Sequence, residues 1–236
     1  MDRTYQICSR CVMDTSDPDI RFDEQGVCNH CHTYDRLIAQ YVYTGAEGQQ
    51  RLNRAIAEIK EAGKGKKYDC LIGISGGVDS TFVAYKVKEA GLRPLAVHLD
   101  NGWDSELAVS NIHKTLNQLG IDLYTHVIDW EEFKDLQVAF LRASTPDSEI
   151  PSDHAIVSLM FEMADEMDIK YVISGRNYRT ETHVAAAWSM GHFDWKYIQN
   201  VHKMFGKVPL ATYPHRTPRE EEVFLRKQVW FDILNY

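Results

Sequence analysis

Apolar residues from position 69 to 175 alternate between short strand-like runs and longer segments with helical spacing. Short apolar runs before glycine or aspartate are typical of buried strands, and apolar positions three or four apart are typical of helices. Four strand–helix units in succession predict an α/β fold, with a doubly wound, mostly parallel sheet and helices on both faces. The expected strands are 70–74, 94–99, 123–128 and 171–174, and the expected helices are 81–90, 105–119, 131–142 and one capped by Ser152 or Asp153 that runs to 167.

The pattern is less regular outside this region. Residues 1–35 are short of aliphatic side chains and rich in Cys, Asp and His, which predicts a small metal-binding module. Residues 36–67 are expected to form a linker and a helix, with a short helix or link at 37–43. The main domain is expected to span 68–236, with helices at 194–205 and 219–232 and a last short strand at 208–212.

Polar loops follow three of the expected strands, at 75–80, 100–104 and 175–177. In an open parallel sheet the carboxyl ends of the strands share one edge, and ligands bind there. We therefore expect a single binding site at this edge.

The loop 75–80 reads Ser-Gly-Gly-Val-Asp-Ser between a strand and a helix. The backbone N–H groups of Gly76, Gly77 and Val78, at a helix N-terminus, are expected to hold phosphate oxygens, with hydroxyls from Ser75 and Ser80. No lysine lies in the loop, which excludes a Walker-type P-loop. The loop resembles the pyrophosphate loop of the N-type ATP pyrophosphatases, which implies ATP as a substrate.

Two aspartates are candidates beside this loop. Asp79 is expected either to brace the loop or to help hold Mg²⁺. Asp100 ends the second strand and is expected to contact the ribose or Mg²⁺, the alternative being that it caps a turn. Catalysis would then rest on positioning and on stabilising the charge of the leaving pyrophosphate.

A rival interpretation uses the overlapping Gly-x-Ser-x-Gly pattern at 73–77, which is typical of the nucleophile elbow of serine hydrolases. Ser75 would be the nucleophile. The pattern follows the first convincing strand, whereas an elbow normally follows several, and a hydrolase leaves Asp79 and Ser80 without a role. The candidate bases would be His183, His192, His202 and His215.

Two Cys-x-x-Cys pairs precede residue 32. In a chain without an export signal such pairs favour a metal over disulfides, and four thiolates suit one structural Zn²⁺. His30 and His32 are alternative ligands. Because no cysteine follows Cys70, the nucleophile is expected to be nitrogen rather than sulfur. The predicted zinc ligands are Cys8, Cys11, Cys28 and Cys31.

Net charge and the lengths of the apolar runs narrow the classes of partner that the sequence allows. The formal net charge is −8, whereas a general nucleic-acid binder is more often basic. We therefore expect no nucleic acid as partner, and a tRNA-modifying ATP pyrophosphatase is kept as the alternative function. No apolar run approaches the length of a membrane span, and no signal-peptide pattern opens the chain. The sequence predicts a cytoplasmic protein without membrane contact.

Together, the segments 8–20, 26–31, 73–80 and 100–103, with 150–154 and 174–181, resemble the N-acetyl sugar amidotransferase family of bacterial surface-glycan synthesis (lipopolysaccharide O-antigen or flagellar glycan). This resemblance implies an adenine nucleotide alpha hydrolase-like fold and an AMP-forming, C–N bond-forming enzyme. Such an enzyme adenylates the acetamido oxygen of a nucleotide-linked, uronic or nonulosonic sugar. Ammonia then displaces AMP and leaves an acetamidino group.

The resemblance also implies partners and site residues. Ammonia would come from a separate glutaminase subunit that works with a cyclase-like subunit. Members of the family usually continue beyond the equivalent of Tyr236, so a short or truncated chain is expected. Asp79, Ser80, Asp153 and Glu181 are the candidate catalytic residues, Gly175 joins the nucleotide site, and His154, Arg176 and Asn177 are the candidate sugar contacts.

Overall fold

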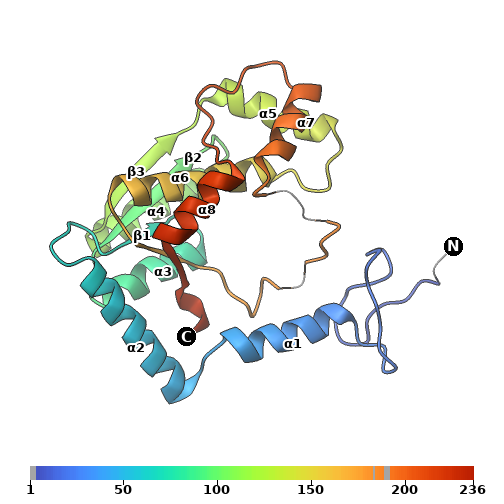
Figure 1. Cartoon of the computed structure of the whole chain (residues 1–236), viewed down its shortest axis with the longest axis horizontal. Helices are drawn as coiled ribbons and strands as arrows, with labels where there is room; N and C mark the ends of the chain where they lie inside the picture. Colours follow the sequence, from blue (N-terminus) through green and yellow to red (C-terminus); the bar gives the residue numbers. More distant parts are fainter. Residues whose placement is uncertain (1–3, 183, 189–191) are drawn as a thin grey trace.

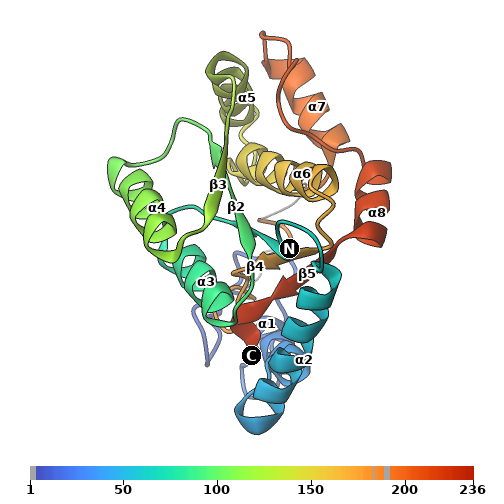
Figure 2. The same cartoon turned by 90° about the vertical axis from the view of Figure 1, so that its left-hand side faces the viewer.

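The computed structural model describes residues 4–182, 184–188 and 192–236. Its centre is a sheet of five strands in the order β3-β2-β1-β4-β5, and all four strand pairs are parallel (Figures 1 and 2). The expected α/β fold with a parallel, doubly wound sheet is confirmed. The strands are β1 (Cys70–Gly73), β2 (Pro94–Asp100), β3 (Asp122–Val127), β4 (Tyr171–Ser174) and β5 (Val229–Asp232).

Helices cover both faces of the sheet because its buried strands are apolar on both sides. In β1, Leu71 packs into one core with α5, α6 and α7, whereas Cys70 and Ile72 pack into the other with α2, α3 and α4. Figure 2 shows α3 and α4 on one side of the sheet and α6 on the other. The helices are α1 (Asn29–Tyr41), α2 (Gly45–Ala62), α3 (Val78–Glu89), α4 (Glu106–Leu119), α5 (Trp130–Arg142), α6 (Ile150–Glu166), α7 (Trp195–Phe205), α8 (Pro218–Lys227) and the short 3₁₀ turn η1 (Ile233–Asn235).

Several helices begin earlier than the sequence predicts. α1 begins at Asn29, directly after a metal-ligand candidate, and α3 begins at Val78, inside the phosphate loop. α6 begins at Ile150, and its N-cap is Glu149. The predicted caps Ser152 and Asp153 are therefore wrong, because both lie within the first turn of the helix.

The prediction of a strand at 208–212 is wrong. The predicted helix at 219–232 is also wrong at its end, because the helix does not continue to 232. Two carboxylates of α5 take the backbone N–H groups of this segment: Asp135 accepts from residues 207 and 208, and Glu132 from residues 212 and 213. These groups are therefore not available to a sheet partner. α8 ends at Lys227, and the chain then becomes extended and pairs as β5 with β4.

Within the described part of the chain, no helix has both the length and the apolar character that a membrane crossing requires.

Candidate functional site

Gly76 fixes the phosphate loop against α4. Its φ is +74°, and a Cβ placed there would lie 2.3 Å from the carbonyl oxygen of Ala108. The side-chain amide of Asn111 also donates to the Gly76 carbonyl at 3.3 Å. The close approach of α4 therefore requires glycine at this position.

The two serine hydroxyls of the loop bond mainly to the loop itself. Ser80 Oγ accepts the N–H of Ser75 and donates to the carbonyl of Gly77, each at 3.2 Å, and the two hydroxyl oxygens are 3.2 Å apart. Gly77 is the N-cap of α3 and has no side chain to cap it. The first N–H groups of α3 therefore remain available for an anion.

Asp79 lies exposed in the first turn of α3. Among the described residues, none donates a hydrogen bond to its carboxylate, so no such contact supports the interpretation that Asp79 braces the loop. At the end of β2, Asp100 Oδ1 accepts the N–H of Gly102 at 3.0 Å. Asp100 thus caps a turn at the edge of the sheet, which is the alternative role considered for it.

Gly175 connects the phosphate loop with the next part of the site. A Cβ on Gly175 would lie 3.6 Å from the Cβ of Asp79 and 3.4 Å from Val83. The end of β4 is therefore packed against the first turn of α3. Because Arg176 follows directly, the chain passes from the phosphate loop into the wall of a neighbouring cavity.

This cavity has a volume of about 950 Å³. It brings together three residues that the sequence predicted as catalytic or sugar-binding: Asp153 from α6, and Arg176 and Glu181 from the segment after β4. The remaining lining side chains come from α1, from α6 and from the segments on either side of residue 190. They are Leu37, Ile156, Val157, Thr182, Val184, His192, Phe193 and Asp194.

Charge in the cavity is mixed. The Arg176 guanidinium lies 5.1 Å from the ring centre of Tyr178, and within the described residues no carboxylate pairs with it. Glu181 accepts the N–H of Asn177 at 3.2 Å. The pKa of Asp153 is raised because burial disfavours its charged form, although His192 opposes that effect. A partly buried carboxylate in a cavity is typical of functional sites.

No protein-family model matches the chain. It is 25% identical over 171 residues to an uncharacterized protein of Methanocaldococcus jannaschii, and the matched region covers 71% of this chain and 58% of that protein. It is 37% identical over 76 residues to the tRNA(Ile)-lysidine synthase of Chlamydia pneumoniae, covering 30% and 23% of the two chains. A tRNA-specific 2-thiouridylase of Fusobacterium nucleatum is 26% identical over 112 residues, covering 44% and 32%.

The glutamine-dependent NAD⁺ synthetase of Acinetobacter baumannii, a solved structure, gives a TM-score of 0.46 at 18% identity, covering 80% of this chain and 37% of that one. The chain spans less than two thirds of the length of each of these proteins. The relatives in sequence and the Ser-Gly-Gly-Val-Asp-Ser loop decide the superfamily.

The chain belongs to the PP-loop ATP pyrophosphatase superfamily.

Within this PP-loop protein, His154 does not contact the cavity, which corrects its predicted role as a sugar contact. Its side chain is 2% exposed. Nδ1 donates to the carbonyl of His192 at 2.8 Å, and Nε2 accepts the N–H of Arg216 at 3.2 Å. The ring stacks near Trp195 and Tyr213. Burial therefore lowers the pKa of His154 and keeps the ring neutral.

Asn177 also has a structural role where the sequence predicted a sugar contact. Its Oδ1 accepts the N–H of Arg179 at 3.0 Å, and its carbonyl accepts the N–H of Glu181. Asn177 is not among the lining residues of the cavity. It shapes the turn that presents Glu181.

Among the described residues, none of the candidate bases of the hydrolase interpretation contacts Ser75. His192 contacts Asp147 and Asp153, His202 contacts the carbonyl of residue 208, and His215 contacts the carbonyl of residue 213. The fourth candidate, His183, lies outside the described residues. The known contacts of the Ser75 hydroxyl are with Ser80 and Gly77.

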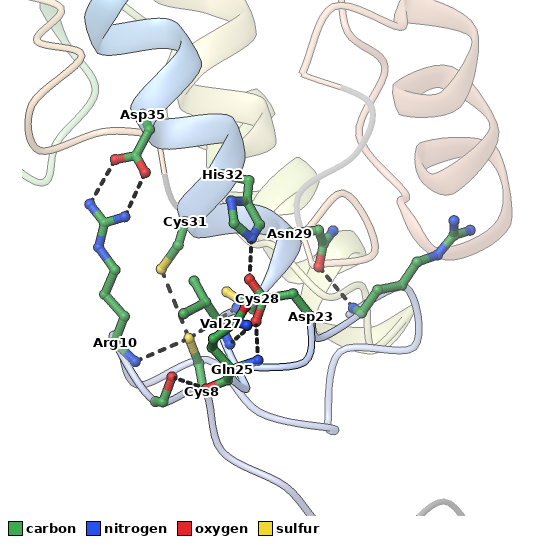
Figure 3. Close-up of polar contacts among 12 residues, drawn as sticks. Cys8, Arg10, Asp23, Gln25, Val27, Cys28, Asn29, Cys31, His32 and Asp35 are labelled. Atoms are coloured by element: carbon green, nitrogen blue, oxygen red, sulfur yellow. Dashed lines mark hydrogen bonds and ion pairs between the residues drawn. The ribbon is translucent and has the colours of Figure 1, made fainter.

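The four predicted cysteines converge at the start of α1. Their Sγ atoms lie within 4.8 Å of one another, with 3.9 Å between Cys8 and Cys31 and 3.7 Å between Cys11 and Cys28. Tetrahedral Zn²⁺ with Zn–S bonds of about 2.3 Å requires S–S separations of about 3.8 Å. The four thiols thus fit a closed, structural zinc site, which Figure 3 shows in part.

Backbone hydrogen bonds favour the thiolate of Cys8, whereas burial raises the pKa values of Cys11 and Cys31. Burial opposes ionisation of Cys8, but the N–H groups of Arg10, Cys11 and Cys28 bring its pKa down to about 6. The two histidines considered as alternative ligands have carboxylate partners instead. His30 contacts Asp17 at 2.6 Å, and His32 contacts Asp23 at 2.8 Å, the latter drawn in Figure 3.

The cysteine module also touches the cavity wall. Ala185 is fully buried in the small core formed by the cysteines and their neighbours, and it follows the lining residue Val184. Leu37 of α1 lines the cavity, and Tyr41 of α1 stacks on Tyr178 with ring centres 4.9 Å apart. The module and α1 therefore support one side of the cavity.

His192 is a cavity residue that sequence reasoning did not place there. It lies 39 positions from Asp153 and outside any periodic segment, so no local pattern connects the two. Only the folded chain brings them into contact.

Proposed function

We propose that this protein is an ATP-dependent, AMP-forming amidotransferase that converts the acetamido group of an acidic or nucleotide-linked N-acetyl sugar into an acetamidino group. The observation that carries the proposal is the packing of Gly175 against Asp79. It joins a phosphate loop to a cavity lined by the carboxylates of Asp153, Glu181 and Asp194 and by Arg176, which pairs with no carboxylate among the described residues.

The phosphate loop is the proposed site of ATP. The open N–H groups at the start of α3 would hold the pyrophosphate portion, and the bonded hydroxyls of Ser75 and Ser80 would keep the loop in shape. The carboxylate of Asp79 has no hydrogen-bond donor among the described residues, which suits a ligand of Mg²⁺. When bound, Mg²⁺ supplies positive charge that stabilises the leaving pyrophosphate.

The neighbouring cavity is the proposed site of the sugar. The acetamido oxygen would attack the α-phosphorus of ATP, and the bond to pyrophosphate would break. Ammonia would then add to the imidate carbon, the C–O bond to AMP would break, and Asp153 or Glu181 would take the proton released from nitrogen. Arg176 would pair with a carboxylate or phosphate of the sugar.

Ammonia needs a source, and the cysteines offer no glutaminase nucleophile. Four of them form the proposed zinc site, and the fifth, Cys70, is buried in β1. We therefore propose a separate glutaminase subunit with a cyclase-like subunit, acting in the cytoplasm. The chain by itself should use free ammonium.

The test is incubation of the chain with ATP, Mg²⁺, ammonium and a diacetamido uronic acid nucleotide. We expect AMP, pyrophosphate and a product lighter by the difference between an oxygen atom and an NH group. Formation of ADP would refute the pyrophosphatase chemistry, and the absence of any acceptor-dependent AMP would refute the choice of substrate.

Matched variants divide the site into its two parts. Asp79→Asn should abolish AMP formation, whereas Glu47→Gln, which removes an acid from the first turn of α2, should not. Arg176→Gln should raise the KM for the sugar about tenfold, which corresponds to about 1.4 kcal/mol, and leave the KM for ATP unchanged. Arg179→Gln, on the same segment but not lining the cavity, is its control.

A second candidate is a tRNA-modifying ATP pyrophosphatase, which is favoured by the names of two relatives. It predicts tight tRNA binding that weakens steeply with salt. The net charge of −8 argues against it. A filter-binding titration with bulk tRNA at two salt concentrations separates the two functions.

A further inference from the structure

His192 lies between two carboxylates at the rim of the cavity. Its Nδ1 is 2.8 Å from Asp153 Oδ2, and its Nε2 is 3.0 Å from Asp147 Oδ2. Asp153 belongs to the first turn of α6, and Asp147 to the loop before that helix. The side chains of His192 and Asp147 are 19% and 20% exposed, whereas that of Asp153 is 50% exposed toward the cavity.

The backbone of His192 is also held in place. Its carbonyl accepts the Nδ1–H of His154, whose ring is buried and whose Nε2 is occupied by the N–H of Arg216. The buried imidazole of one histidine thus positions the second. This contact explains why a histidine follows Asp153 on the inner side of α6.

The chemistry of imidazole limits what His192 does here. A neutral ring carries one N–H, so it donates to one carboxylate, whereas the protonated ring donates to both. Burial and, to a smaller extent, the neighbouring Asp147 raise the pKa of Asp153, and His192 opposes this shift. The other charged groups that line the cavity are Arg176, Glu181 and Asp194.

We propose that His192 is a positioning residue for the reaction proposed above, and that its contact with Asp153 Oδ2 orients this carboxylate toward the bound sugar. Asp147 fixes the opposite side of the ring. One oxygen of Asp153, Oδ1, has no donor among the described residues and would face the substrate. The inference rests on the proposed function, because it assigns Asp153 the role of proton acceptor.

The arrangement itself is tested without any substrate. In the full-length protein with ¹⁵N-labelled histidine, the two ring nitrogens of His192 are expected to report its two carboxylate contacts separately. Asp153→Asn should shift the Nδ1 signal and Asp147→Asn the Nε2 signal. Ring-nitrogen signals that neither variant moves would overturn the proposal whatever the enzyme does.

The role is tested by a double-mutant cycle in the AMP assay with the diacetamido uronic acid nucleotide. His192→Gln should lower kcat by about tenfold or more, up to the about 10²–10⁴-fold that a positioned general base itself contributes, and leave the KM for ATP unchanged. In an Asp153→Asn background the same change should have no further effect, because His192 acts through Asp153. Additive effects would refute the role.

His202→Gln is the matched control. His202 also lies beside an aspartate, with Nε2 3.5 Å from Asp135 Oδ2, and has 18% side-chain exposure, but it lies on α7 outside the cavity lining. It should leave kcat unchanged. If His192→Gln fails to fold, Asp147→Asn replaces it and should lower kcat by a smaller factor, since Asn still accepts one hydrogen bond. Wild-type protein that forms no AMP refutes the proposed function, whereas wild-type turnover with additive variants refutes only the role of His192.

Discussion

Replacing Gly76 with alanine tests whether α4 fixes the phosphate loop. Two costs add at this position. Left-handed backbone costs a residue with a Cβ about 1–2 kcal/mol. The new Cβ would lie 2.3 Å from the carbonyl oxygen of Ala108, and relieving such overpacking costs about 1–3 kcal/mol. We therefore expect the free energy of unfolding to fall by about 2–5 kcal/mol.

Two other glycines separate the two costs. Gly120 has φ +58° with no atom within 4 Å of its ideal Cβ, so Gly120→Ala measures backbone strain alone. Gly77 has φ −78°, and its Cβ would meet only Ser75 Oγ at 3.4 Å, so Gly77→Ala measures an ordinary contact. Gly76→Ala should exceed the sum of both effects.

The assay is urea unfolding with and without ATP and Mg²⁺. In the wild type, ATP at about 100 times its Kd should add about 2.7 kcal/mol of stability. Gly76→Ala should lose most of this gain, because a displaced loop no longer presents its N–H groups. If Gly76→Ala is no less stable than Gly120→Ala and keeps the gain from ATP, the close approach of α4 does not fix the loop.

Three further predictions concern the metal, the pH and a buried carboxylate. Cys28→Ser should abolish zinc binding, measured as metal content, and speed proteolysis near Ala185, which packs in the same small core. The free energy of unfolding should fall by up to about 1.4 kcal/mol per pH unit as the pH drops below 6.5, the ordinary pKa of histidine. The reason is that His154 takes up a proton in the unfolded chain, whereas its buried ring in the folded chain stays neutral. His154→Gln should flatten this dependence in urea titrations. Glu132→Gln should cost about 1–3 kcal/mol of unfolding free energy by leaving a buried N–H of the segment after α7 poorly satisfied, whereas the exposed neighbour change Glu131→Gln should cost little.

The strand and helix pattern was predictable where apolar spacing was strong. The first residues of β1, β2 and β4 were predicted correctly. The helices that precede and follow these strands in the chain also pack against the sheet, so local apolar spacing reports the whole unit. β5 was missed because Val229–Asp232 is a short edge strand directly after a helix. Its pairing depends on β4, which lies 55 or more residues earlier, and no local pattern reports such a partner.

The site was predictable in its parts and less so in its contacts. Asp153, Arg176 and Glu181 were predicted from position and resemblance, and they line one cavity. His154 was assigned to the sugar, but its buried ring instead holds the backbone of His192. Sequence gives the identity of a side chain, whereas the direction in which it points from a helix near its start depends on what packs against that helix.

Sequence alone determined the Ser-Gly-Gly-Val-Asp-Ser loop, the four cysteines and the α/β alternation, since each is a local pattern with a local physical cause. Glycine allows a sharp turn, paired thiolates suit zinc, and apolar spacing follows the period of the element. Only the tertiary structure decided that Gly175 packs on Asp79, that Ala185 joins the cysteine core, and that His192 contacts Asp153. These contacts join residues 39 to 177 positions apart, and they form because burial of the sheet leaves each loop one place to pack.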